Sequence, residues 1–116
     1  MRVIEAFESL VPPTGTIGVM SSGLGSVADN EYGGWEVYRG SKAALNTLMR
    51  SFAARHAGDP RAMLIVAPGW VRTDMGGSDA ELSIEESIPR VVDTITSRSG
   101  VRGLAYLDYR GRTVRW

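Results

Sequence analysis

Tyr38 and Lys42, the latter the only lysine in the chain, stand four residues apart within the run YRGSKAAL. Residues at this spacing share one face of a helix, so the Lys42 ammonium can lie near the Tyr38 phenol and stabilise its deprotonated form. The other twelve basic residues are all arginines. A compact ammonium can approach a phenol or a ribose where a planar guanidinium cannot, so the pair is suited to acid/base work during hydride transfer.

A second group of residues formally matches a dinucleotide-binding turn. Residues 23–28 read GLGSVA, which fits the pattern G-x-G-x-x-A, and they follow an apolar run. A phosphate-binding turn must open a helix, yet residues 29–34 are turn-forming and carry no apolar stripe. We therefore interpret residues 21–34 as a flexible loop rich in serine and glycine, with a phosphate site as the alternative.

A serine hydrolase built on Ser21 or Ser22 is a further candidate. The nucleophile elbow of many such enzymes has glycine two positions before and two positions after the serine, and neither serine here has both. The single histidine, His56, falls near the end of a predicted helix, where we expect it to bond to the last carbonyl groups. The sequence therefore does not favour hydrolase chemistry.

Composition excludes several other kinds of site. The chain has no cysteine, which removes disulfide frameworks, thiolate nucleophiles and zinc fingers. The acidic residues Glu81, Glu85 and Glu86 are typical of the solvated first turn of a helix. We predict no metal site.

Charge and hydropathy bear on partners and location. Thirteen acidic residues balance thirteen basic ones, so neither a nucleic acid nor an anionic membrane is an expected partner. The apolar runs are far shorter than the roughly 20 residues needed to cross a bilayer. Residues 1–5 are amphipathic and carry no secretory segment, so we expect a cytoplasmic location.

Three short apolar runs predict strands. Thr16–Met20 is apolar and β-branched, and we expect it to be buried on both faces. Ala62–Ala67, which reads AMLIVA and ends at a Pro-Gly pair, predicts a central parallel strand. Gly103–Leu107 predicts the third strand, and Arg110-Gly111 a turn into residues 113–116.

Helical periodicity fills the segments between these runs. The chain opens with apolar residues at helical spacing, which stop at Pro12-Pro13. The longest periodic stretch runs from about Trp35 to Ala57 and carries the Tyr38–Lys42 pair. A third helix follows the capping-box pattern of residues 83–86.

The third helix has an ambiguous start. Pro89 implies either a kink or a helix that begins near Ser87. Five apolar residues form the stripe that we expect to face the core: Ile84, Ile88, Val91, Val92 and Ile95.

The alternation of strands and helices predicts right-handed crossovers and a parallel α/β sheet. Three parallel strands make a small sheet, and the chain opens inside a helix. We therefore interpret residues 1–116 as a single partial domain, the C-terminal half of a larger α/β domain.

These residues resemble the short-chain dehydrogenase/reductase family. Tyr38 and Lys42 match its Y-x-x-x-K signature, and the strand end VMSSGLGS resembles its serine segment, in which Ser22 matches the catalytic serine. Ser22 stands 16 residues before Tyr38, a little farther than is usual in the family. This spacing implies a short insertion around residues 29–34 and keeps Ser21 as an alternative.

Two further segments carry the resemblance. VAPGWVRTDM resembles the segment after the sixth strand of the family, and four of its residues match positions that contact the nicotinamide end of the cofactor: Pro68, Gly69, Val71 and Thr73. The ending GLAYLDYRGRTVRW resembles the last strand and turn of the family. The resemblance covers nearly the whole chain, but only about the second half of a typical member.

The resemblance implies a Rossmann-like doubly wound parallel sheet, of which this chain supplies the catalytic half and not the half that binds the cofactor phosphates. It also implies an oxidoreductase that uses NAD or NADP and acts on a small alcohol or carbonyl substrate. Ser22 would hydrogen-bond the substrate oxygen, Tyr38 would exchange its proton, and Lys42 would hold the nicotinamide ribose.

The long helix has a second implied role. Members of the family often form dimers through it, so residues 35–57 are a candidate contact in a homo-oligomer. The alternative interpretation of the chain is a non-catalytic truncated remnant that acts as an assembly or interaction module through this helix.

Overall fold

In the computed structural model, which describes residues 1–116, three strands form one parallel sheet in the order β1-β2-β3. The strands are β1 (Thr16–Met20), β2 (Ala62–Ala67) and β3 (Gly103–Asp108), and both outer strands pair in parallel with β2. The three predicted strands and their parallel arrangement are therefore confirmed. All three carboxyl ends lie at the same edge of the sheet.

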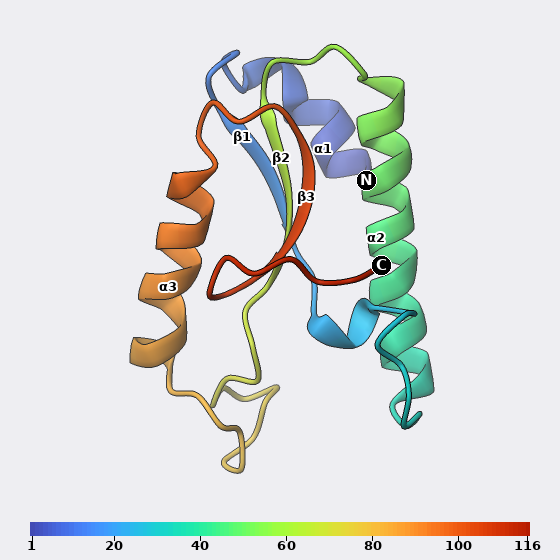
Figure 1. Ribbon diagram of the computed structural model, residues 1–116, viewed down its shortest axis with the longest axis vertical. Coiled ribbons are helices and arrows are strands. Elements are labelled where there is room, and N and C mark those ends of the chain that lie inside the picture. Colours follow the sequence, from blue (N-terminus) through green and yellow to red (C-terminus); the bar gives the residue numbers. More distant parts are fainter.

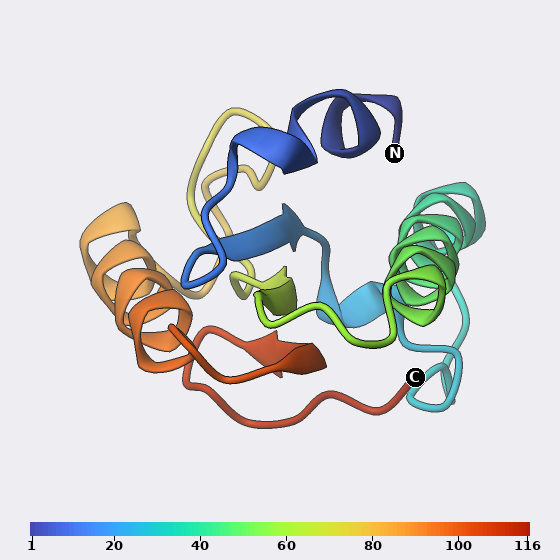
Figure 2. The ribbon, with the colours of Figure 1, turned by 90° about the horizontal axis from the view of Figure 1, so that it is seen from above.

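Helices cover both faces of this sheet (Figure 1, Figure 2). The long helix α2 (Glu36–Arg55) lies on one face with α1 (Arg2–Phe7) and the short 3-10 helix η1 (Glu8–Leu10), while α3 (Ile84–Ser97) lies on the other. A second 3-10 helix, η2 (Gly23–Gly25), follows β1. The fold is thus part of the doubly wound α/β arrangement that the sequence predicts. None of the helices combines the length and apolar character that a membrane-spanning segment requires.

The central strand β2 is buried along its whole length because a helical layer covers each of its faces. Ile65 packs in one core cluster with Met49 and Phe52 of α2. Its neighbour Leu64 packs in a second cluster with Val91 of α3. Alternate residues of β2 therefore join the two cores, as expected for a continuously apolar central strand.

Strand β1 differs from the expectation of burial on both faces. Ile17 is buried in the cluster on the α2 side, whereas Gly18 and Met20 on the opposite side are exposed. The reason is its place in the sheet. It pairs only with β2, while α3 packs against β3 at the other edge and leaves that face of β1 uncovered.

The start of α3 is settled by its cap. The Ser83 hydroxyl accepts a hydrogen bond from the Glu86 N–H (3.1 Å), and the Glu86 carboxylate accepts one from the Ser83 N–H (2.7 Å), so the predicted capping box is confirmed. The helix begins at Ile84, and the alternative start near Ser87 is wrong. Pro89 lies inside the helix without ending it.

The buried face of α3 also differs from the predicted stripe. The residues that meet the sheet side are Ser87, Val91 and Thr94, whereas Ile84, Ile88 and Val92 are exposed. Small and polar side chains let the helix approach the sheet, and the Ser87 hydroxyl is satisfied by donating to the Pro68 carbonyl (2.7 Å). A prediction that uses only apolar residues cannot identify this face, because two of its buried residues are polar.

Candidate active site

Tyr38 and Lys42 occupy successive turns near the start of α2, and both are half-buried. The Lys42 Nζ atom lies 5.8 Å from the centre of the Tyr38 ring. It donates a hydrogen bond to the Met20 carbonyl (3.3 Å), at the last residue of β1. Lys42 therefore brings a positive charge both to the phenol and to the carboxyl end of the first strand.

The two serines that follow β1 have different environments. The Ser21 N–H donates to the Val66 carbonyl of β2 (2.8 Å), and its buried hydroxyl donates to Asn46 Oδ1 (2.6 Å). Ser22 is half-buried, and its hydroxyl oxygen accepts a bond from the Leu24 N–H (3.2 Å). The Ser21 proton is therefore committed inside the protein, while the Ser22 hydroxyl keeps its proton available to another acceptor.

Residues 23–25 form the helical turn η2 within the segment 21–34, which we expected to be a flexible loop. Its N–H groups are occupied internally: Gly25 donates to the Ser22 carbonyl (2.9 Å) and Ser26 to the Gly23 carbonyl (3.1 Å). Gly25 packs so closely on α2 that a Cβ atom there would lie 3.0 Å from Lys42 Cβ. This turn does not open a long helix and does not have the form of a phosphate-binding turn.

Asn46, one turn beyond Lys42 on α2, is a polar residue of the site that the sequence analysis missed. It is buried, accepts from the Ser21 hydroxyl, and donates from Nδ2 to the Gly25 carbonyl (3.2 Å). The sequence did hold one clue. Position 46 lies three residues before Met49 on the stripe of the helix that is predicted to be buried, and an amide at such a position is unusual.

Tyr106 of β3 is a second residue that the sequence analysis missed. Its buried hydroxyl donates to the Ser22 carbonyl, and its ring packs against that of Trp116 (5.6 Å between centres). Burial raises the pKa of Tyr106 above its usual range, and the Asn46 amide acts in the opposite direction. A tyrosine in the middle of an apolar strand gave no sign that its hydroxyl would reach the serine turn.

The C-terminal segment crosses below the carboxyl ends of the strands in Figure 1. It folds back on β3, where the Val114 N–H donates to the Tyr106 carbonyl (2.9 Å). It then runs toward α2, and the Trp116 carbonyl accepts from the Ala28 N–H (2.8 Å). The end of the chain therefore ties β3 to the segment between η2 and α2.

The segment after β2 lies at the same edge of the sheet as the serine turn. Gly69 has a positive φ of 85°, and a Cβ atom there would lie 2.6 Å from Leu82 Cδ1, so this sharp turn requires glycine. Val71 forms a parallel bridge with Leu82, and the Thr73 hydroxyl accepts from the Gly76 N–H (3.1 Å). The segment is an ordered loop, with the Pro68 carbonyl held by α3.

Within this structure, no hydrogen bond or ion pair joins residues 68–73 to Tyr38 or Lys42. The two groups are neighbours by topology, because β1 and β2 are adjacent and both end at this edge. An open α/β sheet places its ligand-binding crevice beyond these carboxyl ends. The candidate site is therefore a shared edge and not a closed pocket.

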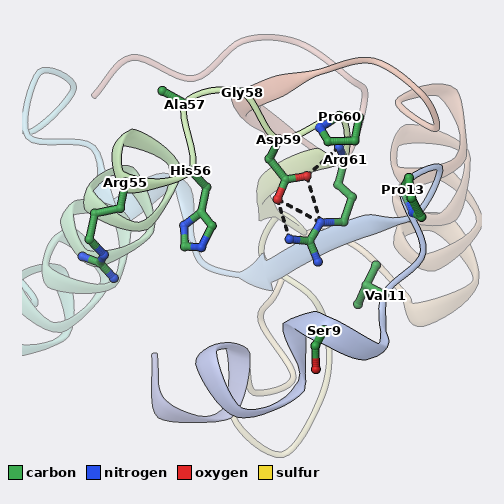
Figure 3. A pocket seen from close by; sticks show the side chains of 10 residues that line it. All are labelled: Ser9, Val11, Pro13, Arg55, His56, Ala57, Gly58, Asp59, Pro60 and Arg61. Atoms are coloured by element: carbon green, nitrogen blue, oxygen red, sulfur yellow. Dashed lines mark hydrogen bonds and ion pairs between the residues drawn. The ribbon is translucent and has the colours of Figure 1, made fainter.

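His56 lies at the end of α2 remote from Tyr38 and is among the residues labelled in Figure 3. Its Nδ1 contacts the Phe52 carbonyl at 2.9 Å, and because a carbonyl only accepts, this nitrogen is the donor. Its Nε2 is 3.1 Å from the Glu8 carboxylate. The predicted contact with the last helical carbonyls is confirmed, and no serine lies within hydrogen-bonding distance of the ring.

The hollow in Figure 3 is not part of the candidate active site. It lies where the chain leaves α2 and enters β2, and charged side chains line it. These side chains are already paired: Arg61 binds Asp59 and Glu8, and Arg55 binds Glu5 (3.0 Å).

The acidic residues at the start of α3 do not gather into a group that could hold a metal ion. Glu86 belongs to the capping box. Its carboxylate accepts a hydrogen bond from the Ser83 N–H, and this bond lowers the pKa of the carboxyl group. Arg72 lies 3.7 Å from the same carboxylate. Glu86 therefore has a structural role.

Comparison with known proteins adds a family. Residues 1–99 match the family model described as enoyl-(acyl carrier protein) reductase. Among curated proteins, the C-signal of Myxococcus xanthus is 37% identical over 97 residues, which are 84% of this chain and 58% of that protein.

Solved structures match more completely. A short-chain dehydrogenase/reductase from Burkholderia multivorans with bound NADP is 66% identical, with a TM-score of 0.98, over 100% of this chain and 50% of that one. A carbonyl reductase from Pseudomonas aeruginosa PAO1 in complex with NADP is 37% identical, with a TM-score of 0.88, over 99% of this chain and 50% of that one. The chain thus spans about half the length of these proteins.

Proposed function

The chain belongs to the short-chain dehydrogenase/reductase family of oxidoreductases, and we propose that it carries the acid/base half of an NAD(P)-dependent enzyme that interconverts a small carbonyl compound and its alcohol. One observation carries the proposal. The Lys42 ammonium links the Tyr38 ring to the end of β1, where Ser22 follows two residues later. A phenol and a cation are thus held beside the strand end from which the Ser22 turn begins, at the edge where an α/β sheet binds its ligands.

The three side chains divide the work of the reaction. In the direction of reduction, Ser22 donates a hydrogen bond to the substrate oxygen on which negative charge develops. Tyr38 gives its proton to that oxygen and becomes a phenolate. Lys42 stabilises the phenolate through its charge and is itself oriented by the Met20 carbonyl. The nicotinamide cofactor supplies the hydride when it is bound.

The donors at this edge fit the nicotinamide end of such a cofactor. Lys42 has three N–H groups, and Met20 is its sole hydrogen-bond acceptor within the chain, so two remain for ribose hydroxyls. Pro68, Gly69, Val71 and Thr73 are the proposed contacts for the carboxamide. The phosphates are a different matter, because the N–H groups of η2 are already used internally. The chain itself has no turn suited to hold them.

NADP is the cofactor named for the two solved structures above, and this supports NADP or NAD as the cofactor here. We also propose small-molecule partners and a cytoplasmic location for this enzyme. Contacts between copies through α2 complete the proposal, because Val37 and Leu48 of this helix are exposed.

A second candidate function is assembly without catalysis. The observation that favours it is the same pair of exposed apolar residues on α2, together with the absence from this chain of a turn that could hold cofactor phosphates. The two candidates differ in one measurable property. The oxidoreductase must bind the cofactor, and the assembly module need not.

Titration of the purified chain with NADPH and NADH, followed by fluorescence and calorimetry, separates the two candidates. The oxidoreductase proposal predicts binding tighter than about 1 mM, weakened by Lys42→Ala because the ribose then loses its donor. Binding that is undetectable, or that Lys42→Ala leaves unchanged, would favour the assembly module for this chain.

A further inference from the structure

Asn46 has the least expected environment of any polar residue near the site. It is only 3% exposed and lies on a helix otherwise packed through apolar residues such as Met49 and Phe52. Burial of an amide is costly unless its donors and acceptors are satisfied. Here both ends are used, since Oδ1 accepts from the Ser21 hydroxyl and Nδ2 donates to the Gly25 carbonyl.

The two partners of Asn46 flank the proposed catalytic serine. Ser21 precedes Ser22, and Gly25 follows it by three residues at the end of η2. The amide therefore spans the base of the turn that presents Ser22. The turn is also held close to α2, because a Cβ atom on Gly25 would lie 2.9 Å from Asn46 Nδ2.

Asn46 also shares the helix face of the proposed acid/base pair. Tyr38, Lys42 and Asn46 follow one another at intervals of four residues along α2. Side chains at this spacing lie on one face of a helix. One rigid element therefore carries the phenol, the ammonium and the anchor of the serine turn.

From this arrangement we infer that Asn46 is a positioning residue, which fixes the Ser22 hydroxyl relative to the Tyr38 hydroxyl. The inference rests on the proposed function. Ser22 and Tyr38 must meet the same substrate oxygen, so the distance between a loop and a helix has to be held within a fraction of an ångström. The two hydrogen bonds of Asn46 are direct polar links between the serine turn and that helix.

An amide is chemically suited to this role. The Ser21 hydroxyl needs an acceptor and the Gly25 carbonyl needs a donor, and the Asn side chain supplies both from one planar group. A carboxylate cannot donate, and an apolar side chain can do neither. Glutamine is one methylene longer and would press on the turn where the packing against Gly25 is already tight.

The test uses the full-length natural protein that contains these residues, with NADPH and a panel of aromatic aldehydes and ketones. In Asn46→Ala we expect kcat to fall at least about tenfold while the KM for NADPH stays within about twofold, because Asn46 is buried and both ends of its amide are bonded within the protein. Amide hydrogen exchange of residues 21–26 should rise in parallel. Thr47→Ala, at the exposed neighbouring position on α2, is the matched control and should leave both readouts unchanged.

Ser21→Ala guards against an Asn46 variant that fails to fold, because it removes one of the two hydrogen bonds and leaves the amide in place. It should lower kcat by a smaller factor, again without a change in the KM for NADPH. A kcat within twofold of the natural protein in both variants would overturn the inference, and so would a loss of NADPH affinity that matches the loss of kcat. If the natural protein reduces no carbonyl compound, the proposed function is wrong. If it does reduce one and Asn46→Ala does not change the rate, only the positioning role is contradicted.

Discussion

At the scale of single residues, Lys42 is placed so that its size matters as much as its charge. Its Nζ contacts the Met20 carbonyl and faces the Tyr38 ring, between α2 and the end of β1. The spacing of the pair predicted an ammonium near the phenol, and the structure adds the Met20 carbonyl as its hydrogen-bond partner. The sequence did not predict the carbonyl partner, because that contact joins residues 22 positions apart.

We predict that Lys42→Arg lowers kcat by about 10- to 100-fold although the charge is kept, because the planar guanidinium cannot occupy the space between the Met20 carbonyl and the phenol. Steady-state kinetics of the full-length natural protein provides the measurement. Arg55→Lys, an exchange of the same two residue types at an exposed position of α2, is the control. Equal activity of Lys42→Arg and the natural protein would show that the lysine is incidental.

Asn46 and Tyr106 mark the limit of residue-level prediction. Spacing along a helix identifies residues that share a face, and this suffices for the Tyr38–Lys42 pair. The hydrogen bonds of Asn46 and Tyr106 instead reach carbonyl groups 21 and 84 residues away. No local pattern encodes such contacts, so these residues became visible only in the fold.

At the scale of elements, the docking of η2 on α2 decides where the serine turn lies. Apolar runs predicted all three strands because a strand covered on both faces needs an unbroken run of apolar residues, and one covered on a single face needs them at alternate positions. The same reasoning misjudged α3, whose contact face contains Ser87 and Thr94. Hydrophobic patterning therefore predicts the elements better than it predicts which of their faces meet.

Gly25→Ala tests the docking of η2 directly. A Cβ atom there would lie 2.9 Å from Asn46 Nδ2 and 3.0 Å from Lys42 Cβ, so the turn must move away from the helix. We expect a loss of about 1–3 kcal/mol in the free energy of unfolding, measured by urea denaturation. Gly23→Ala in the same turn meets no atom within 4 Å and should change stability by less than about 0.5 kcal/mol. Equal effects of the two substitutions would mean that the close packing of η2 is not a feature of the folded protein.

At the scale of the whole molecule, charged groups tie the first helices to the edge of the sheet remote from the candidate site. Arg61 binds the Asp59 carboxylate through Nε (2.9 and 3.0 Å) and donates to the Glu8 carbonyl. The hydrogen bond from Arg61 lowers the pKa of Asp59 to about 2. Asp59 and Arg61 are only 9% and 13% exposed, so this pair is more than a surface ion pair.

The pair predicts how stability depends on pH. Because the pKa of Asp59 is lower in the folded chain than its ordinary value of 3.8, its contribution is complete above about pH 4 and is lost as the pH falls toward 2. We expect Asp59→Asn to be less stable than the natural sequence by about 1 kcal/mol at pH 7, because solvent screens part of the interaction, and this difference to shrink between pH 4 and pH 2. Urea denaturation of both chains across this range is the measurement. A difference that is the same at pH 7 and pH 2.5 would contradict the assignment.

The two ends of the sheet differ in the polar groups that they carry. Its amino-end edge holds a cluster of ion pairs, and its carboxyl-end edge holds polar groups with unused donors, notably Lys42. The chain matches about half of each of these two solved relatives, so its sequence predicts only the part of a cofactor site that its own residues would supply.

The proton transfer by Tyr38 is the central claim, and Tyr38→Phe in the full-length natural protein tests it most directly. The substitution removes only the hydroxyl, so it separates chemistry from packing. Turnover of a carbonyl substrate should fall by about 10²- to 10⁴-fold while the Kd for NADPH changes by less than about twofold, because the phenol acts in the proton transfer and Lys42 still holds the ribose. A Tyr38→Phe protein that reduces the substrate at the natural rate would contradict the account.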